Sequence, residues 1–313
     1  MKATIQRLHH FQHIPSASGM EIIGNRLYVV GDDSPFLYVL DLASLLVEDQ
    51  IRLFESGDFG SGRIPKLLKP DLECLTRLDM NGASTLVAFG SGSTPNRARG
   101  YSIQLPAGNQ EGAQVQSHSL SDLYQALQAD EDLLGNDVLN LEAAAATPDK
   151  LLLLQRATQA GTNLLLSFPR QEFVSYMSGT GKKLPVYEAI SFHLPDLAGL
   201  PARFSGAVAY HDKLFVTASV ENTTDAILDG EVLGSFVGWI ELDAVKGDRG
   251  LLELHTALVT DGAGKPYPGK VESLVILDSP RPHTFRALAM TDNDQGQSDL
   301  LELELTLVAG PGE

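Results

Sequence analysis

One unit recurs five times along this chain of 313 residues, and no other feature of the sequence constrains the fold as strongly. Each unit opens with Ser or Glu, continues into a short, largely apolar run, and reaches a second apolar run after a brief turn. The five opening residues are Ser18, Glu73, Glu142, Ser205 and Glu272. The intervals between these residues are nearly equal along the whole chain. A repeat that covers the chain in this way predicts a single domain over residues 1–313, built from five copies of one unit.

Each unit is predicted to contain four strands. A polar turn follows the two apolar runs, and a third run such as Leu300–Leu305 alternates apolar with polar residues, as a half-buried strand does. A more polar fourth run, such as Glu188–Leu194 or Leu252–Leu258, follows in four of the units. Residues 3–9 have the same alternation and can supply the missing strand by pairing with the third strand of the last unit. The N-terminal segment would thereby close a ring.

These features predict an all-β fold, a five-bladed β-propeller closed by the N-terminal strand, which leaves only short and protected sheet edges. The alternative is a β-sandwich with accidental similarity between segments, which would not require a near-constant period. One short helical insertion is expected over residues 121–134, with Ser121 as N-cap and Gly135 as the stop. Residues 170–185 are expected to form a long loop, and residues 310–313 a frayed end.

Three carboxylates and two hydroxyls are expected to meet in the central channel, because the first strand of each propeller blade is the innermost. Converging carboxylates must be protonated, paired with basic groups or bound to a cation. Hard oxygen ligands favour calcium over zinc, and the single cysteine, Cys74, excludes thiolate zinc sites. The sequence therefore predicts a Ca²⁺ site made by Ser18, Glu73, Glu142, Ser205 and Glu272. The alternative is that these acids begin their strands and point to solvent.

Basic side chains accompany this ring. Lys69, Arg203 and Lys270 precede ring residues by two or four positions, so alternation places them on the same strand face. They could hold a small anionic ligand, such as a phosphate or carboxylate, above the cation. They could equally neutralise the ring. The sequence leaves both interpretations open.

The polar ends of the second strands are expected to gather at one mouth of the channel, where loops commonly form ligand pockets. Asp32, Arg156 and Asp292 are among these residues. The loop at residues 90–99 adds Arg97 and several backbone N–H groups, which together could cradle an anion, although Gly and Ser are also ordinary turn residues.

The composition limits the partners. The chain has 40 acidic and 23 basic residues and a formal net charge of −17, which argues against nucleic acid and anionic membranes as partners. It contains no apolar run long enough to span a membrane and begins without the apolar core of a signal peptide. Together with the cysteine content, this favours a cytoplasmic location. The oligomeric state stays open.

Three short motifs are set aside. The acidic segment from Asp292 lacks the glutamate that an EF-hand loop requires, since Leu303 occupies that place. Residues 178–183 lack the first glycine of a phosphate-binding P-loop. His9, His10 and His13 have a spacing more typical of a solvated strand edge than of a metal site.

The segments Ser18–Asp33, Arg203–Ser205 and Lys270–Glu272 resemble the calcium-activated nucleotidases, or soluble apyrases. The resemblance implies a five-bladed propeller with one calcium held in the channel by Ser and Glu side chains in the same order as in this chain. It implies hydrolysis of nucleoside di- and triphosphates. The chain departs from that family at Ser34 and Pro35, where the family has an Arg-Thr-Gly turn, and it lacks the secretory context.

A second resemblance points in the same chemical direction. The segments Lys69–Glu73 and Thr291–Asp294 resemble bacterial propellers related to esterase-like phytases. That resemblance implies phosphate esters as substrates. Both resemblances are stronger evidence for the fold than for the activity.

The first functional hypothesis is a calcium-dependent phosphohydrolase that acts on nucleotides or other small phosphorylated compounds. Asp32 or Glu21 would act as the base, and Lys69, Arg97 or Arg156 would stabilise developing negative charge. The alternative is a non-catalytic propeller with a structural calcium that binds a protein or small ligand. A glycosidase would require a pair of carboxylates about 5–10 Å apart, which the sequence does not fix.

Overall fold

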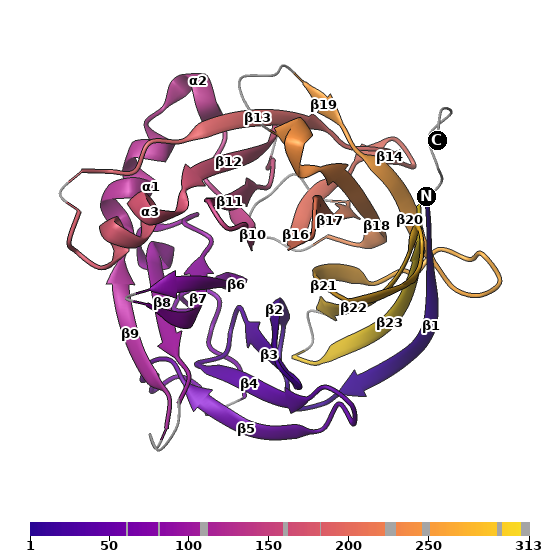
Figure 1. Cartoon of the computed structure of the whole chain (residues 1–313), viewed down its shortest axis with the longest axis horizontal. Coiled ribbons are helices and arrows are strands. Elements are labelled where there is room, and N and C mark those ends of the chain that lie inside the picture. The colour runs from indigo at the N-terminus through magenta and orange to yellow at the C-terminus, as the bar shows by residue number, and fades with distance from the viewer. Residues whose placement is uncertain are drawn as a thin grey trace.

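The computed structural model describes residues 1–60, 62–80, 82–106, 112–158, 162–181, 183–222, 230–245, 251–292 and 296–307. Within these ranges the chain is built almost entirely from β-strands, most of which form five antiparallel groups of four strands each. Two of these groups are joined edge to edge into one eight-stranded sheet, and another is extended by a fifth strand. Figure 1 shows the sheets arranged around a central axis, with the first strand of each sheet innermost. The all-β propeller predicted from the repeat is confirmed.

The sheets, or blades, follow one another in chain order, and the strands of each blade run from the channel outward in the order named. Blade 1 comprises β2 (Ala17–Ile23), β3 (Arg26–Gly31), β4 (Phe36–Asp41) and β5 (Val47–Arg52). Blade 2 comprises β6 (Leu72–Met80), β7 (Ala83–Gly90), β8 (Arg99–Gln104) and β9 (Gln114–Ser119). Blade 3 comprises β10 (Leu141–Ala146), β11 (Lys150–Gln155), β12 (Asn163–Pro169) and β13 (Glu188–His193). Blade 4 comprises β16 (Arg203–Tyr210), β17 (Lys213–Glu221), β18 (Val232–Glu241) and β20 (His255–Thr260). Blade 5 comprises β21 (Lys270–Arg281), β22 (Thr284–Asp292), β23 (Ser298–Thr306) and β1 (Lys2–Phe11).

The N-terminal strand closes the ring as predicted. β1 runs antiparallel to β23 over its whole length, from the pair Lys2 and Thr306 to the pair Phe11 and Ser298. Residues Ala3 and Thr4 also pair in parallel with β20 of blade 4. The closing strand therefore hydrogen-bonds within its own blade and to blade 4, and it covers edges that would otherwise be exposed.

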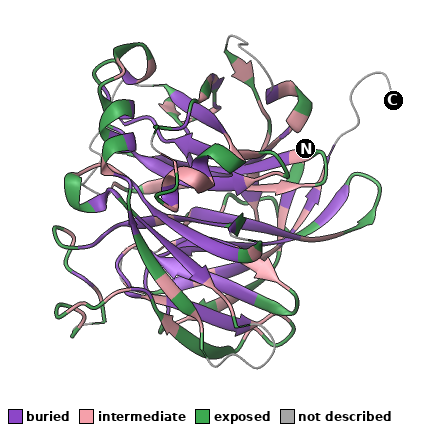
Figure 2. Cartoon of the chain, turned by 60° about the vertical axis from the view of Figure 1, so that its left-hand side comes forward, coloured by how far each residue is buried: buried purple, intermediate pink, exposed green. Residues whose placement is uncertain are grey.

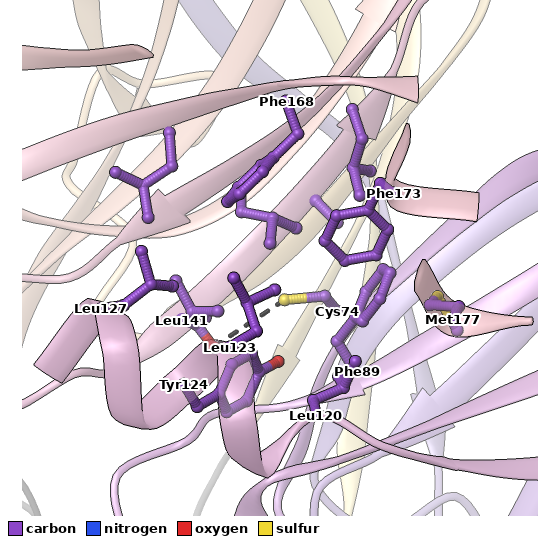
Figure 3. Close-up of a cluster of buried hydrophobic side chains, with 14 of the residues drawn as sticks. Cys74, Phe89, Leu120, Leu123, Tyr124, Leu127, Leu141, Phe168, Phe173 and Met177 are labelled. Carbon is purple, nitrogen blue, oxygen red and sulfur yellow. Dashed lines mark hydrogen bonds between the residues drawn. The ribbon is translucent and has the colours of Figure 1, made fainter. Parts of the chain in front are cut away.

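The core lies between the blades. Because side chains alternate across each strand, every sheet has two faces, and each face packs against the next blade. Five clusters of buried apolar side chains fill the five junctions, and Figure 2 shows the buried residues concentrated on the inner parts of the strands. The cluster between blades 2 and 3 also receives side chains from helices, including Tyr124 and Phe173, which lie close to Cys74 in Figure 3.

The helical insertion is shorter and more divided than the sequence suggests. α1 spans Ser121–Gln128 with Leu120, not Ser121, at its N-cap, and α2 spans Glu131–Leu134. The break falls at Asp130, whose carboxylate accepts a hydrogen bond from the backbone N–H of Leu133 at 3.2 Å. Asp favours a capping position over a helix interior, so it divides the predicted helix.

Residues 170–185 are not simply a loop, because α3 occupies Arg170–Met177. Phe173 and Met177, four residues apart, lie on one helix face and are buried in the cluster between blades 2 and 3. The glycines and lysines that follow obscure this short pattern in the sequence. The predicted frayed end at residues 310–313 lies outside the described residues.

Three short strands fall outside the repeated pattern. β14 (Asp196–Leu197) and β15 (Leu200–Pro201) form a separate hairpin. β19 (Leu252–Glu253) pairs in parallel with β13 and extends blade 3. The predicted strand from Leu252 to Leu258 is thus divided, since only its second part, β20, belongs to blade 4. Within the described residues, no helix has both the length and the apolar character needed to cross a membrane.

Candidate functional site in the central channel

The five ring residues occupy equivalent positions in the strand pairing. In each blade the register between the first two strands shifts near the start of the inner strand, and one residue of that strand is left there without a partner. Those unpaired residues are Ser18, Glu73, Glu142, Ser205 and Glu272. A β-bulge turns a side chain away from the regular alternation and is a typical device next to functional sites. The same bulge therefore presents the same position of every blade to the channel.

The two serines of the ring form hydrogen bonds to the inner strand of the next blade. The hydroxyl of Ser18 donates a hydrogen bond to the carbonyl oxygen of Leu72, and Ser205 donates to that of Val271 at 2.6 Å. Each accepting carbonyl belongs to the residue directly before a ring glutamate. The serines thus fix the backbone that carries Glu73 and Glu272.

The ring opens into a polar cavity of about 420 Å³ at one mouth of the channel. It brings together four of the five ring residues with three of the residues predicted to act on substrate. The residues from these two groups that line it are Ser18, Glu73, Glu142, Glu272, Asp32, Lys69 and Arg97. Asp292, predicted at the mouth, also lines it. The cavity lining among the described residues does not include Ser205, Glu21 or Arg156.

Most ring carboxylates are withdrawn from solvent, contrary to the alternative in which they begin their strands and face water. Glu142 and Glu272 are 7% and 3% exposed, and Glu73 is half-buried. Such groups require compensation, because burial disfavours the charged form of a carboxyl group.

Lys69 compensates two acids at the mouth. Its ammonium group forms ion pairs with Asp32 and with Asp71, the second at 2.9 Å. Arg97 pairs with the other oxygen of Asp71 at 2.7 Å. Burial acts to raise the pKa of Asp71, but Lys69 and Arg97 outweigh it and lower that pKa. For Asp32 burial dominates despite Lys69, and it raises the pKa to about 7.

A second buried network joins blades 3, 4 and 5. Arg156 donates to Glu221 at 2.7 Å, and its Nε lies 4.0 Å from Glu142. Lys270 lies 3.3 Å from Glu221 and 2.6 Å from Glu272. Burial opposes ionisation of Glu221, but Lys270 and Arg156 prevail and lower its pKa to about 2. Arg156 therefore lies behind the ring, where it supports Glu142 and Glu221, rather than in the cavity wall.

Basic groups do not compensate the whole ring. Among the described residues Glu73 has neither a hydrogen-bond partner nor an ion-pair partner. Burial raises its pKa well above the usual value, and the nearby Asp71 and Glu142 raise it further. Burial likewise raises the pKa of Glu272 to about 8, although Lys270 acts to lower it. The carboxylates exceed the positive charge available to them.

Some buried carboxylate oxygens in the same region lack hydrogen-bond partners among the described residues. Oδ1 of Asp32 and Oε2 of Glu272 are buried without a hydrogen-bond partner. Buried carboxylate oxygens are normally paired, so each such atom requires an explanation. Both atoms belong to residues that line the cavity.

The tightest grouping of candidate ligand atoms is not the predicted ring. Among the described residues, only the carboxylate oxygens of Asp32, Asp71 and Glu73 lie within 4.8 Å of one another as a set of three. Glu73 therefore forms a set of three with acids of the channel mouth and not with the other two ring glutamates. Asp71 stands two positions before Glu73, but sequence reasoning did not group it with Asp32 and Glu73 as a ligand set.

Glu21 lies apart from the cavity. It follows Ser18 on β2 and accepts a hydrogen bond from the backbone N–H of Ile22 at 3.1 Å. Burial raises its pKa, and its nearest basic influence is Arg77 of blade 2. As a candidate base, it is less well placed than Asp32.

One solved structure shares the fold, and others are similar at lower scores. Glutaminyl cyclase from Myxococcus xanthus matches with a TM-score of 0.51 and 12% identity, covering 98% of this chain and 97% of that one. An α-L-arabinanase from Cellvibrio cellulosa, solved with arabinohexaose, gives a TM-score of 0.49 at 13% identity, covering 97% and 94%. Domains 1–2 of Drosophila semaphorin 1b give 0.44 at 9%, covering 98% and 81%. Similarity at this level of identity extends to the fold alone.

The sequence itself matches no curated protein. One family model matches residues 13–305 and is described as a family of unknown function, DUF6929. That span includes strands of all five blades and every residue of the predicted ring. The chain therefore belongs to the family of unknown function DUF6929.

Proposed function

We propose that this propeller binds a hard divalent cation, calcium, in the mouth of its central channel and hydrolyses small phosphorylated compounds there. The observation that carries the proposal is the state of Glu73. This side chain has no hydrogen-bond or ion-pair partner of its own among the described residues, and burial and the acids around it raise its pKa although Lys69 acts to lower it. A bound cation would remove that electrostatic cost.

The donor atoms suit calcium. The described residues that line the cavity offer carboxylate, hydroxyl and amide oxygens but neither cysteine nor histidine. Calcium takes about six to eight oxygen ligands and tolerates irregular geometry, with water completing the shell. Glu73, Glu142 and Glu272 would hold the ion, together with Ser18, and Asp32 and Asp71 lie within reach of Glu73. Ser205 supports the ring from behind through Val271.

The resemblance to calcium-activated nucleotidases supports the same assignment. The order Ser, Glu, Glu, Ser, Glu around the ring matches that family, and in this chain each of the five residues stands at a β-bulge. Nucleotides and related phosphate esters are therefore the first substrates to test.

The chemistry assigns distinct roles to the side chains of the mouth. When bound, calcium supplies polarisation of a phosphoryl oxygen and orientation of water. Asp32 lines the cavity beside Glu73 and in its ionised form can accept a proton, so it is the candidate general base. Lys69 and Arg97 line the same cavity and can stabilise negative charge on a phosphoryl group.

A non-catalytic propeller with a structural calcium is the second candidate, and one observation favours it. Lys69, Arg97 and Lys270 are all engaged with carboxylates of the site. A substrate phosphate would have to compete with these acids for the same cations. In this alternative the basic groups neutralise the mouth, and the surface around it binds a ligand without chemistry.

The experiment that separates the two is a phosphate-release assay on nucleotides and phosphate monoesters, with added calcium and with EDTA. The proposal predicts calcium-dependent release that falls at least about 100-fold in Asp32→Asn, as expected for loss of a general base. Asp49→Asn on the exposed strand β5 is the matched control and should behave like the native protein. Calcium-dependent thermal stabilisation without phosphate release would favour the non-catalytic propeller, and the absence of both would overturn both candidates.

A further inference from the structure

A polar patch interrupts an interface that is otherwise apolar. Strand pairing places Ser102 of β8 and both Gln116 and His118 of β9 on the face of blade 2 that is turned toward blade 3. At the neighbouring junction, the third strand of blade 1 presents Leu37 and Val39 to blade 2, and both are buried among apolar side chains. The outer corner of blade 2 therefore differs from that of blade 1, because it places polar residues between two blades.

Two of these residues form a nucleophile and base pair. The hydroxyl oxygen of Ser102 lies 2.7 Å from Nε2 of His118. Nδ1 of the same ring lies 2.8 Å from the carbonyl oxygen of Met177, at the end of α3. A carbonyl oxygen can only accept a hydrogen bond, so Nδ1 carries the proton and Nε2 accepts from Ser102. This is the order of contacts that activates a serine, with the backbone carbonyl orienting the base.

The pair faces a cavity rather than solid core. Ser102 and His118 line a space of about 300 Å³, together with the exposed side chains of Gln114 and Gln116, through which it reaches the surface. Burial lowers the pKa of His118, so the ring is neutral and can accept a proton at pH 7. None of the described residues lining the cavity bears a formal charge when His118 is neutral.

An unused donor faces the same space. The hydroxyl of Ser178, directly after α3, is buried without a hydrogen-bond partner and belongs to a residue of the cavity wall. Gln116 lies directly opposite Ser102 in the strand register. These two groups offer hydrogen bonds to an oxyanion that develops beside Ser102.

We propose that Ser102 and His118 form a second active site, separate from the channel, that hydrolyses small uncharged carboxylic esters. The separation follows from the architecture, because the pair lies on the two outer strands of blade 2, whereas the channel site is built on the inner strands (Figure 1). The cavity size limits the substrate to a short acyl ester, and its neutral lining favours an ester without charge.

The reaction balances with water as the only co-reactant. Oγ of Ser102 attacks the ester carbonyl while its proton moves to Nε2 of His118. The tetrahedral intermediate then breaks its bond to the alcohol oxygen, which takes that proton and leaves as the alcohol. Water attacks the acyl-serine with His118 as base, and the acid departs as Ser102 recovers its proton.

The test treats the full-length protein in EDTA with a small alkyl fluorophosphonate, which phosphonylates an activated serine with release of fluoride. Peptide mass spectrometry locates the adduct, and p-nitrophenyl acetate hydrolysis is followed in parallel. We expect one adduct on Ser102, no adduct there in Ser102→Ala, and at least a 100-fold slower reaction in His118→Gln. Ser117→Ala, an exposed neighbour on β9, is the matched control and should leave the rate unchanged.

Two results would overturn the proposal: no adduct on Ser102 in the native protein, or an equal rate of labelling in a folded His118→Gln variant. If that variant does not fold, the pH dependence of labelling of the native protein decides. The rate should rise through a single pKa below 6.5 and then level, and a rate that simply follows hydroxide concentration would contradict a role for His118. Since EDTA is present throughout, failure of this test leaves the calcium proposal for the channel unaffected.

Discussion

Glu73 and Glu221 show how differently one residue type behaves at two places in this channel. Glu221 lies between Arg156 and Lys270, and its pKa is lowered to about 2. Glu73 forms no ion pair, and burial and the neighbouring carboxylates raise its pKa although Lys69 acts to lower it. The first is part of the folded framework, whereas the second is available to a ligand. Repeat equivalence identified Glu73 from the sequence, but the surroundings that distinguish the two residues arise only in the folded ring.

Replacing Glu73 by Gln removes the uncompensated charge. In EDTA at pH 8 we expect Glu73→Gln to melt roughly 1–3 °C above the native protein, since about 1 kcal/mol corresponds to about 1.5 °C for a chain of this size. Excess calcium should raise the melting temperature of the native protein by roughly 3–5 °C, as about 2–3 kcal/mol of ligand linkage implies, and that of the variant much less. Differential scanning calorimetry measures both effects. Equal calcium shifts in the two proteins would rule out Glu73 as a ligand.

Glu221→Gln is expected to be costly. The substitution leaves Arg156 and Lys270 buried with less compensating charge, which typically destabilises a protein by about 3–5 kcal/mol. Urea unfolding at pH 7 measures the loss. Glu55→Gln is the matched control, because its pair with Arg52 is exposed, and such pairs contribute at most about 1 kcal/mol. A loss for Glu221→Gln no larger than that of the control would show that the network is not structural.

At the scale of elements, the two serine bulges depend on the glycines that follow them. A Cβ on Gly206 would lie 2.7 Å from the carbonyl oxygen of Glu272 and 2.9 Å from Cα of Ser273. Gly19 has the same relation to the next blade, with the backbone N of Leu75 at 2.7 Å. The glycines therefore permit two inner strands to approach more closely than any side chain would allow. The sequence shows the Ser-Gly pairs. The need for glycine at these positions becomes clear only in the folded protein, because the strand that each glycine contacts is distant in sequence.

Gly206→Ala should force β16 away from β21. We expect a loss of about 1–3 kcal/mol, the usual cost of overpacking, together with weaker calcium binding, because the clash falls on the backbone of Glu272. Calorimetry with and without calcium measures both. Gly57→Ala is the control, because a Cβ there meets nothing within 4 Å. If both variants behave like the native protein, the close approach of the strands has no role in shaping the ring.

Local patterns predicted the strands well and the irregular elements poorly. Alternation and apolar runs are properties of a single segment, so the repeated strands and the closing role of β1 could be inferred without the structure. α3 was missed because one buried face of eight residues carries little pattern. The grouping of Asp32 and Asp71 with Glu73 depends on side-chain directions at a bulge, which no spacing rule reveals.

At the scale of the whole molecule, the channel couples stability to pH. In the folded protein without metal, burial raises the pKa of Glu272 to about 8 and that of Asp32 to about 7. Folding therefore favours the protonated forms of both groups. The stability from these groups is fully present below about pH 4 and is lost as the pH rises toward 8. Glu221 acts in the opposite sense, since its contribution is lost as the pH falls from about 4.5 toward 2.

The metal-free protein should therefore melt several degrees lower at pH 8 than at pH 5.5, and saturating calcium should reduce or abolish that difference. Thermal melts across this range in EDTA and in calcium provide the measurement. The melting temperature falls with rising pH because burial suppresses ionisation of Glu272 and Asp32. A bound cation would favour the ionised forms and so remove this effect. A metal-free melting temperature that rises over the same range would contradict the assignment of excess carboxylates to the channel.

The central claim is that a calcium ion occupies the acidic mouth of this ring. The most direct measurement is the anomalous scattering of crystals grown with calcium, recorded at a wavelength where calcium contributes. We predict one peak on the channel axis, about 2.3–2.6 Å from carboxylate oxygens that include Glu73 and at least one other ring glutamate. Crystals without any peak among Glu73, Glu142 and Glu272, with well-ordered carboxylates bridged by water or lysine alone, would contradict it.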